Sequence, residues 1–408
     1  MQPTYKNKKF IDDIDFLNKT VILRVDFNVP IQNGEISSIK RIIASLKTIK
    51  KIVNNGGKLV ILSHLGRIKS KEDLPKKSLR IVAEKLAEIL GQEIKFIPEN
   101  RGPKVENAIN QLEKGEILVL ENTRFQDLNN KAESKNDAEL GRYWASLGDV
   151  FINDAFGTLH RAHGSNVGIA TYIKESAIGY LVKEELDALS KLIFSPQRPF
   201  YAIIGGAKIS DKIGIISTLL EKADKVLIGG GMAYTFKKAL GYKIGLSIYE
   251  DDKLELAASL VKKYPDKLIL ALDAALAPEF ADLEPLYNQE NPLEIPDHLE
   301  GMDIGPLTIE LFKDHLKDGK TILWNGTLGV AEFKNFARGT KEVAKIIANL
   351  KDCYSIIGGG DSIAAIEAEG LSNSFSHIST GGGASISFIE NGDLIGLGPI
   401  QEKKLKEL

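Results

Sequence analysis

Residues 20–28 of the chain are TVILRVDFN, an apolar run that ends in a polar break at Asp26 and Asn28. A run of this length without alternation is typical of a strand that is buried on both faces. The following stretch, ISSIKRIIASLKTIKKIVNN at 36–55, has its apolar residues at helical spacing. Strand, polar break and helix in this order predict one repeat of a parallel α/β fold.

The same order recurs along the chain. Each further apolar run ends in a Gly or Asx break: KLVILSHLG (58–66), EILVLENTR (116–124), DVFINDAFG (149–157), PFYAIIGGA (199–207), KVLIGGGM (225–232), KLILALDA (267–274), TILWNGT (321–327) and SIIGGGDS (355–362). A long helical stretch before SPQRP interrupts this order, which then restarts. We therefore expect two Rossmann-like parallel-sheet α/β domains, 1–178 and 194–391, joined by a helix at 179–193 and separated by a cleft.

Composition limits the classes of function. The 408 residues are 43% hydrophobic and 26% charged, as in a soluble globular protein of two or three domains. A net charge of -2 provides no global field to attract nucleic acid or an anionic membrane, so we expect neither as a partner. A single cysteine, Cys353, excludes a disulfide framework. The start lacks a signal-peptide pattern and no apolar run approaches the roughly 18 residues of a membrane span, so we expect a cytoplasmic protein.

Arginine is unevenly distributed. Only ten arginines occur, and eight of them lie in the first 161 residues. Arginine suits bidentate recognition of phosphate or carboxylate, whereas lysine acts as a point charge. Arg80, Arg101 and Arg142 fit ordinary surface positions. We expect the other five to converge on one anionic ligand: Arg24, Arg41, Arg67, Arg124 and Arg161.

Ligands of open parallel sheets bind beyond the carboxyl ends of the strands. In the first half, the polar residues after the apolar runs are Asp26, Asn28, His64, Arg67, Arg124, Asn153 and Asp154. In the second half, the corresponding positions are Asp273 and the segments GGAKISDK (205–212), GGGMAYTF (229–236), WNG (324–326), GGGDS (358–362) and STGGGAS (379–385). One set is cationic and the other is rich in glycine, which predicts two different ligands facing each other across the cleft.

The glycine triplets fit phosphate binding but not the common nucleotide motifs. The last glycine of G-x-G-x-x-G is replaced by Tyr234, Ile363 and Ile386, which disfavours a dinucleotide-binding dehydrogenase. GKT at 319–321 precedes a strand and has Asp314 in place of the leading glycine, so it is not a Walker A loop. Helix N-termini are ready anion sites. Lys208 and Lys212 are four residues apart, and we expect them on one helix face beside a phosphate.

Metal and acyl-transfer sites have little support. His160 and His163 form an H-x-x-H pair without a third ligand nearby, which disfavours zinc. Asp154 is expected to orient its loop rather than bind metal. Asp361 could cap a helix or bind Mg²⁺ beside phosphates, and the residues alone favour neither. No G-x-S-x-G elbow occurs, so an acyl-enzyme is not indicated.

Several motifs together resemble the phosphoglycerate kinase family. They run in order from about residue 20 to 398: RVDFNVP (24–30), SHLGR (63–67), LENTRF (120–125), DVFINDAFGTLHRAHGSNVGI (149–169), GGAKISDK, IGGGMAYTF, GMDIGP (301–306), LWNGTLGV, FARGT, IIGGGDS and HISTGGGAS. The resemblance implies a monomeric glycolytic enzyme that transfers a phosphoryl group reversibly between 1,3-bisphosphoglycerate and MgADP, giving 3-phosphoglycerate and MgATP. It also implies in-line transfer after domain closure.

The resemblance also implies a role for each matching residue. The N-terminal domain, to which segment 392–408 is expected to return, would bind the glycerate substrate through Asp26, Phe27, Asn28, Arg41, His64, Leu65, Gly66, Arg67, Arg124, His160 and Arg161. The C-terminal domain would bind ADP or ATP through Lys208, Lys212, Gly229, Gly230, Asn325, Gly329, Glu332, Gly359, Gly360, Asp361 and Ser362, with Asp361 as the Mg²⁺ ligand. The groups implied to meet the transferring phosphoryl are Arg41, Lys208, Gly382 and Gly383.

The chain departs from the family pattern at four places. Thr327 stands where proline is usual, Ala331 where an aromatic residue is common, and Ser362 where threonine is common, which keeps the hydroxyl. The end GDLIGLGPIQEKKLKEL (392–408) differs from the usual ending. A binding protein without activity on the same scaffold would be expected to lack Arg41, Lys208 or Asp361, and all three are present. Another nucleotide-dependent transferase would accept ATP but not 3-phosphoglycerate.

Overall fold

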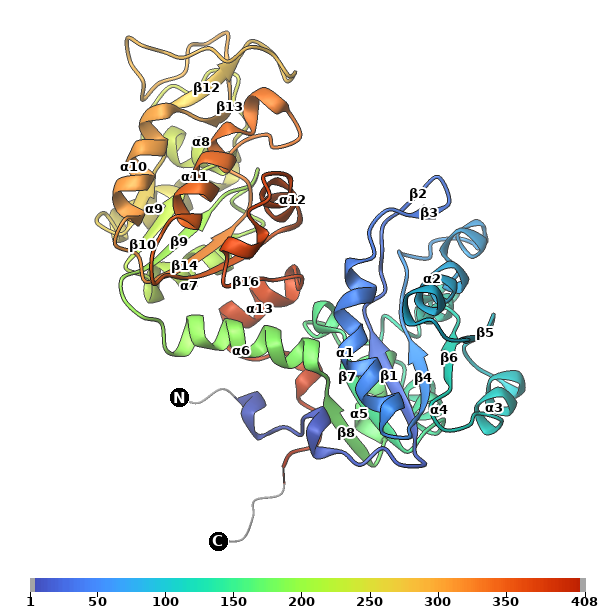
Figure 1. The fold of residues 1–408 in the computed structure, drawn as a ribbon. Coiled ribbons are helices and arrows are strands. Elements are labelled where there is room, and N and C mark those ends of the chain that lie inside the picture. The colour runs from blue at the N-terminus through green and yellow to red at the C-terminus, as the bar shows by residue number, and fades with distance from the viewer. Residues whose placement is uncertain (1–3, 404–408) are drawn as a thin grey trace, which may run out of the picture. The chain divides into compact units, whose positions relative to one another are not determined.

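The computed structural model describes residues 4–403 (Figure 1). The chain divides into two compact units. The first unit runs to Asp187 and takes in the chain again from Asp393, and the second unit is Ala188–Gly392. Each unit contains one sheet of six parallel strands, which confirms the α/β class. The division falls inside the helix Tyr180–Phe194 (α6), whereas the sequence predicted a separate joining helix at 179–193.

The sheet of the first unit has the order β5-β6-β4-β1-β7-β8. Its strands are β1 (Thr20–Val25), β4 (Lys58–Leu62), β5 (Lys95–Ile97), β6 (Ile117–Leu120), β7 (Val150–Asp154) and β8 (Glu175–Ile178), and a small hairpin is formed by β2 (Ile31–Gln32) and β3 (Glu35–Ile36). The α-helices that begin in this unit are α1 (Lys40–Asn54), α2 (Arg80–Leu90), α3 (Pro103–Asn110), α4 (Ala138–Ala145), α5 (Ile169–Tyr172) and α6. This is the blue-to-green part of the ribbon in Figure 1.

The sheet of the second unit has the order β11-β10-β9-β14-β15-β16. Its strands are β9 (Phe200–Ile204), β10 (Lys225–Ile228), β11 (Leu268–Leu270), β14 (Thr321–Asn325), β15 (Tyr354–Gly358) and β16 (His377–Ile378), beside an antiparallel pair formed by β12 (Ala274–Ala277) and β13 (Glu300–Ile304). Its helices are α7 (Ile213–Lys222), α8 (Met232–Ala239), α9 (Leu254–Lys263), α10 (Pro306–Leu316), α11 (Arg338–Ala348), α12 (Gly360–Ala368) and α13 (Gly383–Asn391).

The register of the central strands brings their carboxyl ends to one edge. Arg24 of β1 pairs with Leu62 of β4 and with Asn153 of β7. The loops after these strands therefore leave the sheet at the same level. The strands are mainly apolar because both faces are covered, and Ile22 of β1 is 0% exposed.

Helix α1 shows how packing fixes the position of a candidate site residue. Ile42, Ile49 and Ile52 recur at helical spacing and are buried in the core that β1 and β4 also form. Each buried isoleucine stabilises this packing by roughly 2 kcal/mol. The packed face holds the first turn of α1, with Arg41, next to the carboxyl end of β1.

The described part of the C-terminal segment, 393–403, lies against the first unit. The amide of Gln401 donates to Ser176 Oγ at 2.9 Å, and the amide of Gly396 donates to the Leu159 carbonyl at 2.9 Å. Residues 404–408 of the segment that the sequence predicted to return here lie outside the described residues. Within residues 4–403, no helix has the length and apolar character needed to cross a membrane.

Asp154, at the end of β7, holds the start of α6. Its Oδ1 accepts from the amides of Leu181 at 2.9 Å and Val182 at 3.3 Å, which are orphan donors of the first turn. A Cβ at Gly179 would lie 2.2 Å from this Oδ1, so the close approach requires glycine. Burial raises the pKa of Asp154 to about 6. The predicted loop-orienting residue is thus a helix cap.

We predict that Asp154→Asn changes how stability depends on pH. Because the folded-state pKa of about 6 lies above the usual pKa of an aspartate, about 4 in an unfolded chain, the wild-type protein loses stability as pH rises through this window. The Asn side chain can keep the Oδ1 bonds and does not titrate. The unfolding free energy of the wild type, relative to the variant, should fall by about 3 kcal/mol at most between pH 4 and 7. Denaturant titrations at a series of pH values measure it, and a constant difference would contradict the prediction.

Candidate functional site

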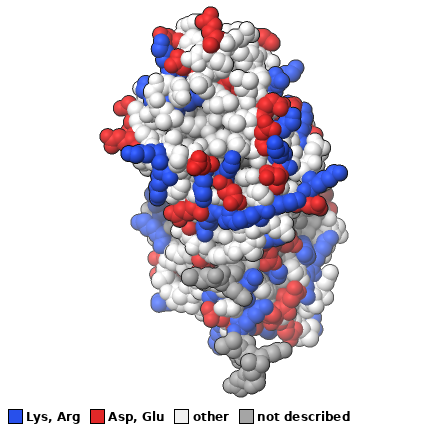
Figure 2. Space-filling view, turned by 90° about the vertical axis from the view of Figure 1, so that its left-hand side faces the viewer, with Lys and Arg blue, Asp and Glu red and all other residues white. Residues whose placement is uncertain are grey.

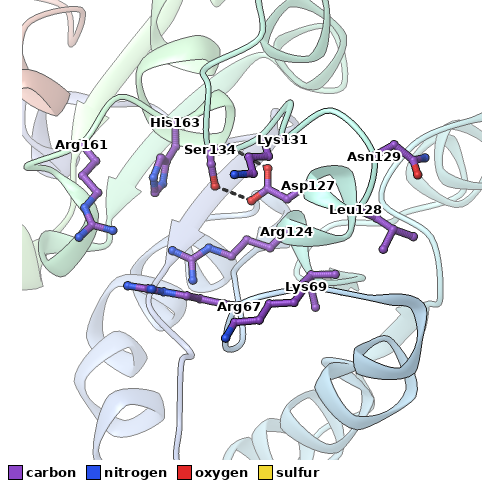
Figure 3. Close-up of a pocket in the computed structure, with 11 residues that line it drawn as sticks. Arg67, Lys69, Arg124, Asp127, Leu128, Asn129, Lys131, Ser134, Arg161 and His163 are labelled. Carbon is purple, nitrogen blue, oxygen red and sulfur yellow. Dashed lines mark hydrogen bonds between the residues drawn. The ribbon is translucent and has the colours of Figure 1, made fainter.

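Three arginines from separate loops line one cavity in the first unit. We call this cavity of 640 Å³ the basic pocket. It is lined by Arg67, Ile68, Lys69, Arg124, Asp127, Leu128, Asn129, Lys131, Ser134, Arg161 and His163. Figure 3 shows the guanidinium groups of Arg67, Arg124 and Arg161 gathered at one side of it. Burial and the charges of Arg161 and Arg67 lower the pKa of Arg124, an arrangement that favours a bound anion.

The loops that carry these arginines are tied together at Gly66. Asn28 Oδ1 accepts from the Gly66 amide at 2.7 Å, and Arg124 Nη1 donates to the Gly66 carbonyl at 2.6 Å. Gly66 has a φ of +62°, which suits glycine. Asn28, Gly66 and Arg124, all predicted from the sequence, therefore form one connected structure at the ends of β1, β4 and β6.

Asp26 and Arg41 form an ion pair between Oδ2 and Nη1. Burial raises the pKa of Asp26, but the positive charges around it, Arg41 included, outweigh burial and hold that pKa below its usual range. Arg41 does not line the basic pocket in this structure. Its guanidinium group is partly exposed, with 35% of the side-chain surface accessible.

Two predicted substrate-site residues contribute through their backbone only. The side chains of Phe27 and Leu65 are buried in the core of the first unit. The Phe27 amide donates to Ser63 Oγ at 2.9 Å, which ties the end of β1 to the end of β4. Neither side chain is available to a ligand.

The histidines of the HRAH stretch are uncharged near neutral pH. Burial lowers the pKa of His160, and burial together with neighbouring arginines lowers the pKa of His163 to about 3. Both Nδ1 atoms are buried without a partner in the described structure. His163 lines the basic pocket and Arg161 is exposed beside it. These histidines can therefore offer hydrogen-bonding atoms to a ligand but no charge.

Arg24 departs from the predicted convergence of five arginines. It is 0% exposed and does not line the basic pocket. Its Nε donates to Ser165 Oγ at 2.8 Å, and its Nη2 lies 3.1 Å from His64 Nδ1. It belongs to strand β1 itself, so its side chain enters the interior instead of leaving the sheet edge.

The second unit has a different cavity, which we call the glycine-lined pocket. Its volume is 260 Å³. It is lined by Gly206, Ala207, Gly230, Gly231, Tyr234, Ile248, Phe280, Glu300, Gly301, Met302, Thr327, Gly329, Val330, Glu332 and Asp361. Gly230 has a φ of +69°, and a Cβ there would lie 2.6 Å from the Gly206 amide nitrogen. Only glycine fits this wall, which leaves backbone open to a flat ligand.

The predicted helix face that carries Lys208 and Lys212 is wrong. Helix α7 begins at Ile213, after both lysines. The segment is held outside the helix because Glu250 accepts hydrogen bonds from the amide and hydroxyl of Ser210. Lys208 is exposed, beside Ile248 and Tyr249.

Lys212 is half-buried, whereas Lys208 is exposed. Its Nζ donates to Asn325 Oδ1 at 2.7 Å and to the Asn325 carbonyl at 3.1 Å. Burial lowers the pKa of Lys212 to about 8, while Asp211 and Asp361 oppose this shift. Asn325 thus positions a lysine and does not line the glycine-lined pocket. Gly229 does not line this pocket either, and a Cβ at Gly229 would lie 2.6 Å from Leu328 Cδ2.

All three glycine triplets lie at the starts of helices. The N-caps of α8, α12 and α13 are Gly231, Gly359 and Gly382, and none has a side-chain cap bond. Space is open at Gly360 and Gly382, where a Cβ would meet no atom within 4 Å. The first amides of α12 and α13 can therefore approach an anion.

Two side chains of the first turn of α12 could act on a ligand. Asp361 is exposed and borders the glycine-lined pocket. It is not the N-cap of α12, because that position is Gly359. Ser362 is buried, and its Oγ has no partner in the described structure. Among residues 4–403, no group of three or more His, Cys, Asp or Glu could hold a metal ion. A magnesium ion can, however, use one carboxylate together with phosphate oxygens, and the exposed Asp361 fits that donor set.

The sequence interpretation missed several pocket residues. In the basic pocket these are Ile68, Lys69, Asp127, Leu128, Asn129, Lys131, Ser134 and His163. The polar stretch after LENTRF was the available signal for most of them. In the glycine-lined pocket, Ile248, Phe280 and Glu300 were missed. Ile248 and Phe280 come from loops far from any glycine motif, and Glu300 directly precedes the GMDIGP motif.

The comparisons with known proteins agree with this arrangement. The family model "Phosphoglycerate kinase" matches residues 11–392. The chain is 99% identical over 403 residues to a phosphoglycerate kinase from Mesomycoplasma hyopneumoniae, covering 99% of this chain and 100% of that one. It is 54% identical to the enzyme from Enterococcus faecalis, covering 97% of this chain and 100% of that one.

Solved structures show the same fold. The phosphoglycerate kinase of Coxiella burnetii superposes with a TM-score of 0.86 at 35% identity, over 96% of this chain and 98% of that one. The enzyme of Pyrococcus horikoshii gives a TM-score of 0.82 at 32% identity, again over 96% and 98%. Because the family model matches residues 11–392 and a relative is 99% identical over 99% of the chain, the chain belongs to the phosphoglycerate kinase family.

Proposed function

We propose that the basic pocket binds the glycerate substrate and that the glycine-lined pocket binds the nucleotide in the reaction of this family. That reaction is the reversible phosphoryl transfer between 1,3-bisphosphoglycerate and MgADP, which gives 3-phosphoglycerate and MgATP. The observation that carries the proposal is the gathering of Arg67, Arg124 and Arg161 at one side of a single pocket. Three guanidinium groups suit the phosphate and carboxylate of the triose.

The groups beside the basic pocket orient the rest of the triose. Asp26 and Asn28 can accept from hydroxyl groups, and the neutral His64 and His160 can hydrogen-bond to oxygen atoms. The Gly66 loop, held by Asn28 and Arg124, presents backbone to the ligand, which explains why Phe27 and Leu65 belong to the motif without exposing their side chains.

In the second unit, the base would lie against backbone and apolar side chains. Gly230 and Gly329 leave room for a flat ring, while Ile248 and Phe280 supply apolar contact. The exposed carboxylate of Glu332 is suited to the ribose hydroxyls. Thr327, in place of the usual proline, lines the same pocket, so this departure bears on nucleotide affinity.

The nucleotide phosphates would bind the free amides of α12 and α13, assisted by Lys212 and the Ser362 hydroxyl. Members of the family act on nucleotides with Mg²⁺, and we assign the metal to Asp361. Magnesium neutralises phosphate charge when bound. The pKa of Lys212 rises again beside phosphate, so that the lysine binds as a cation.

Phosphoryl transfer needs alignment and charge neutralisation rather than a covalent enzyme intermediate. We assign the charges that meet the transferring group to Arg41 and Lys208, with Gly382 and Gly383 donating backbone hydrogen bonds. Transfer in line requires the two ligands to be brought together, which we assign to closure of the two units. Release of Arg41 from Asp26 would accompany this step.

The remaining proposals concern setting and partners. We propose a cytoplasmic monomer that acts on small molecules and binds neither nucleic acid nor membrane. In support, the net charge is -2, and on the face that Figure 2 shows, basic side chains lie among acidic ones around areas with neither. Sedimentation at several concentrations tests the oligomeric state.

We predict that Arg161→Ala weakens 3-phosphoglycerate binding and leaves ADP binding unchanged. Loss of a charge-assisted contact to the triose costs about 2 kcal/mol, or roughly thirtyfold in Kd. Calorimetric titration with each ligand measures both effects. The matched control is Arg142→Ala, because Arg142 lies over the Tyr172 ring at 4.7 Å, outside the basic pocket. Equal loss for both ligands would count against two separate half-sites.

We predict that Asp361→Asn removes most of the gain in ADP affinity that Mg²⁺ provides, by roughly tenfold or more, because the carboxylate charge is lost. ADP affinity without metal should stay nearly the same. Calorimetry with and without Mg²⁺ gives the ratio. Asp352→Asn is the control, since Asp352 is exposed in the same unit and its left-handed φ of 54° suits Asn. If Mg²⁺ still raised the ADP affinity of Asp361→Asn by the full wild-type factor, Asp361 would not be the metal ligand.

A further inference from the structure

The buried guanidinium group of Arg24 contacts the ring of His64. Arg24 is 0% exposed, and its Nη2 lies 3.1 Å from His64 Nδ1. Its Nε donates to Ser165 Oγ at 2.8 Å, and its Nη1 donates to the Val25 carbonyl. Arg24 makes its contacts entirely inside the first unit, so it cannot act by touching a ligand.

The contact with His64 has only one chemically reasonable direction. A guanidinium group has five N–H donors and no acceptor. His64 Nδ1 must therefore accept, and its ring proton must be on Nε2. The Nε2 atom has no hydrogen-bond partner among the described residues and is not fully buried, although the residue is only 6% exposed. It is the one ring atom that can donate outward.

We propose that Arg24 is a positioning residue that fixes His64 as the neutral Nε2–H tautomer, so that His64 offers the substrate one hydrogen-bond donor and no charge. The part that concerns substrate rests on the proposed binding of the glycerate ligand in the first unit. The ligand group that it fits is an oxygen acceptor, a carboxylate or hydroxyl oxygen, beside the three arginines of the basic pocket.

The charges that face His64 agree with a neutral ring. Burial lowers the pKa of His64 well below 6.5, and Arg24, Arg124 and Arg41 add to this effect. Asp26 alone raises it, and the Asp26 carboxylate is already paired with Arg41. His64 therefore stays uncharged through the physiological range, and its hydrogen bond does not vary with pH there.

A second buried group holds Arg24 in place. Ser165 receives the Arg24 Nε bond and donates both its hydroxyl and its amide to the Glu133 carboxylate, the amide at 2.8 Å. Glu133 is 0% exposed and belongs to the same loop as Lys131 and Ser134 of the basic pocket. A series of hydrogen bonds thus runs from the loop that lines the basic pocket to His64, through Glu133, Ser165 and Arg24.

The wild-type protein itself gives the first test. Nitrogen-15 NMR of histidine-labelled full-length protein distinguishes Nδ1–H, Nε2–H and the imidazolium, and His64→Gln assigns the signal. We expect the Nε2–H form at every pH from 5.5 to 8, without titration. An imidazolium that titrates near pH 6.5, or an Nδ1–H signal, would overturn the proposal. This result does not depend on substrate, so it separates a failure here from a failure of the proposed binding site.

Variants test the positioning role. Arg24→Met removes the donor, so we expect mixed tautomers and a KM for 3-phosphoglycerate about tenfold higher, with kcat and the nucleotide KM nearly unchanged. Arg24→Lys keeps a donor and should restore both the tautomer and much of the KM. If Arg24→Met raises KM while His64 keeps its Nε2 proton, the role is only structural and the proposal fails. Arg142→Met is the matched control for loss of an arginine in this unit.

Discussion

The parallel register of the central strands is the constraint on which the first unit depends. Because Arg24 of β1 is level with Leu62 of β4 and Asn153 of β7, the residues that follow these strands leave the sheet at one edge. Asp26, Arg67 and Arg161 come from loops far apart in sequence, yet the register places them around one region. A slip of one residue would turn each side chain to the opposite face of the sheet.

The interior of the first unit contains two buried charged residues, Arg24 and Glu133, whose burial costs desolvation free energy. A buried guanidinium and a buried carboxylate are expensive to desolvate, and they are tolerated because each is hydrogen-bonded. Burial raises the pKa of Glu133, and Arg24 opposes this shift. The ordered network is useful because side chains that support a site fix the orientation of the groups that touch the ligand.

Much of this could be predicted from sequence, and the failures have physical causes. The positions of Arg67 and Arg124 in loops after strands could be predicted from the apolar runs and from parallel pairing. Lys208 and Lys212 look helical by spacing, but Glu250, about forty residues away, holds their segment in a turn. Arg24 sits inside its strand, so its burial depends on partners in other loops. Phe280 enters the glycine-lined pocket from a loop without a motif.

In the proposed function, the two pockets serve one reaction, one holding the triose and the other the nucleotide. Steady-state turnover in a coupled assay with 3-phosphoglycerate, ATP and Mg²⁺, and in the reverse direction with 1,3-bisphosphoglycerate and ADP, tests it directly. We expect turnover in both directions, and in each direction it should require both substrates. ATP consumption without the triose, or no turnover with all components present, would contradict it.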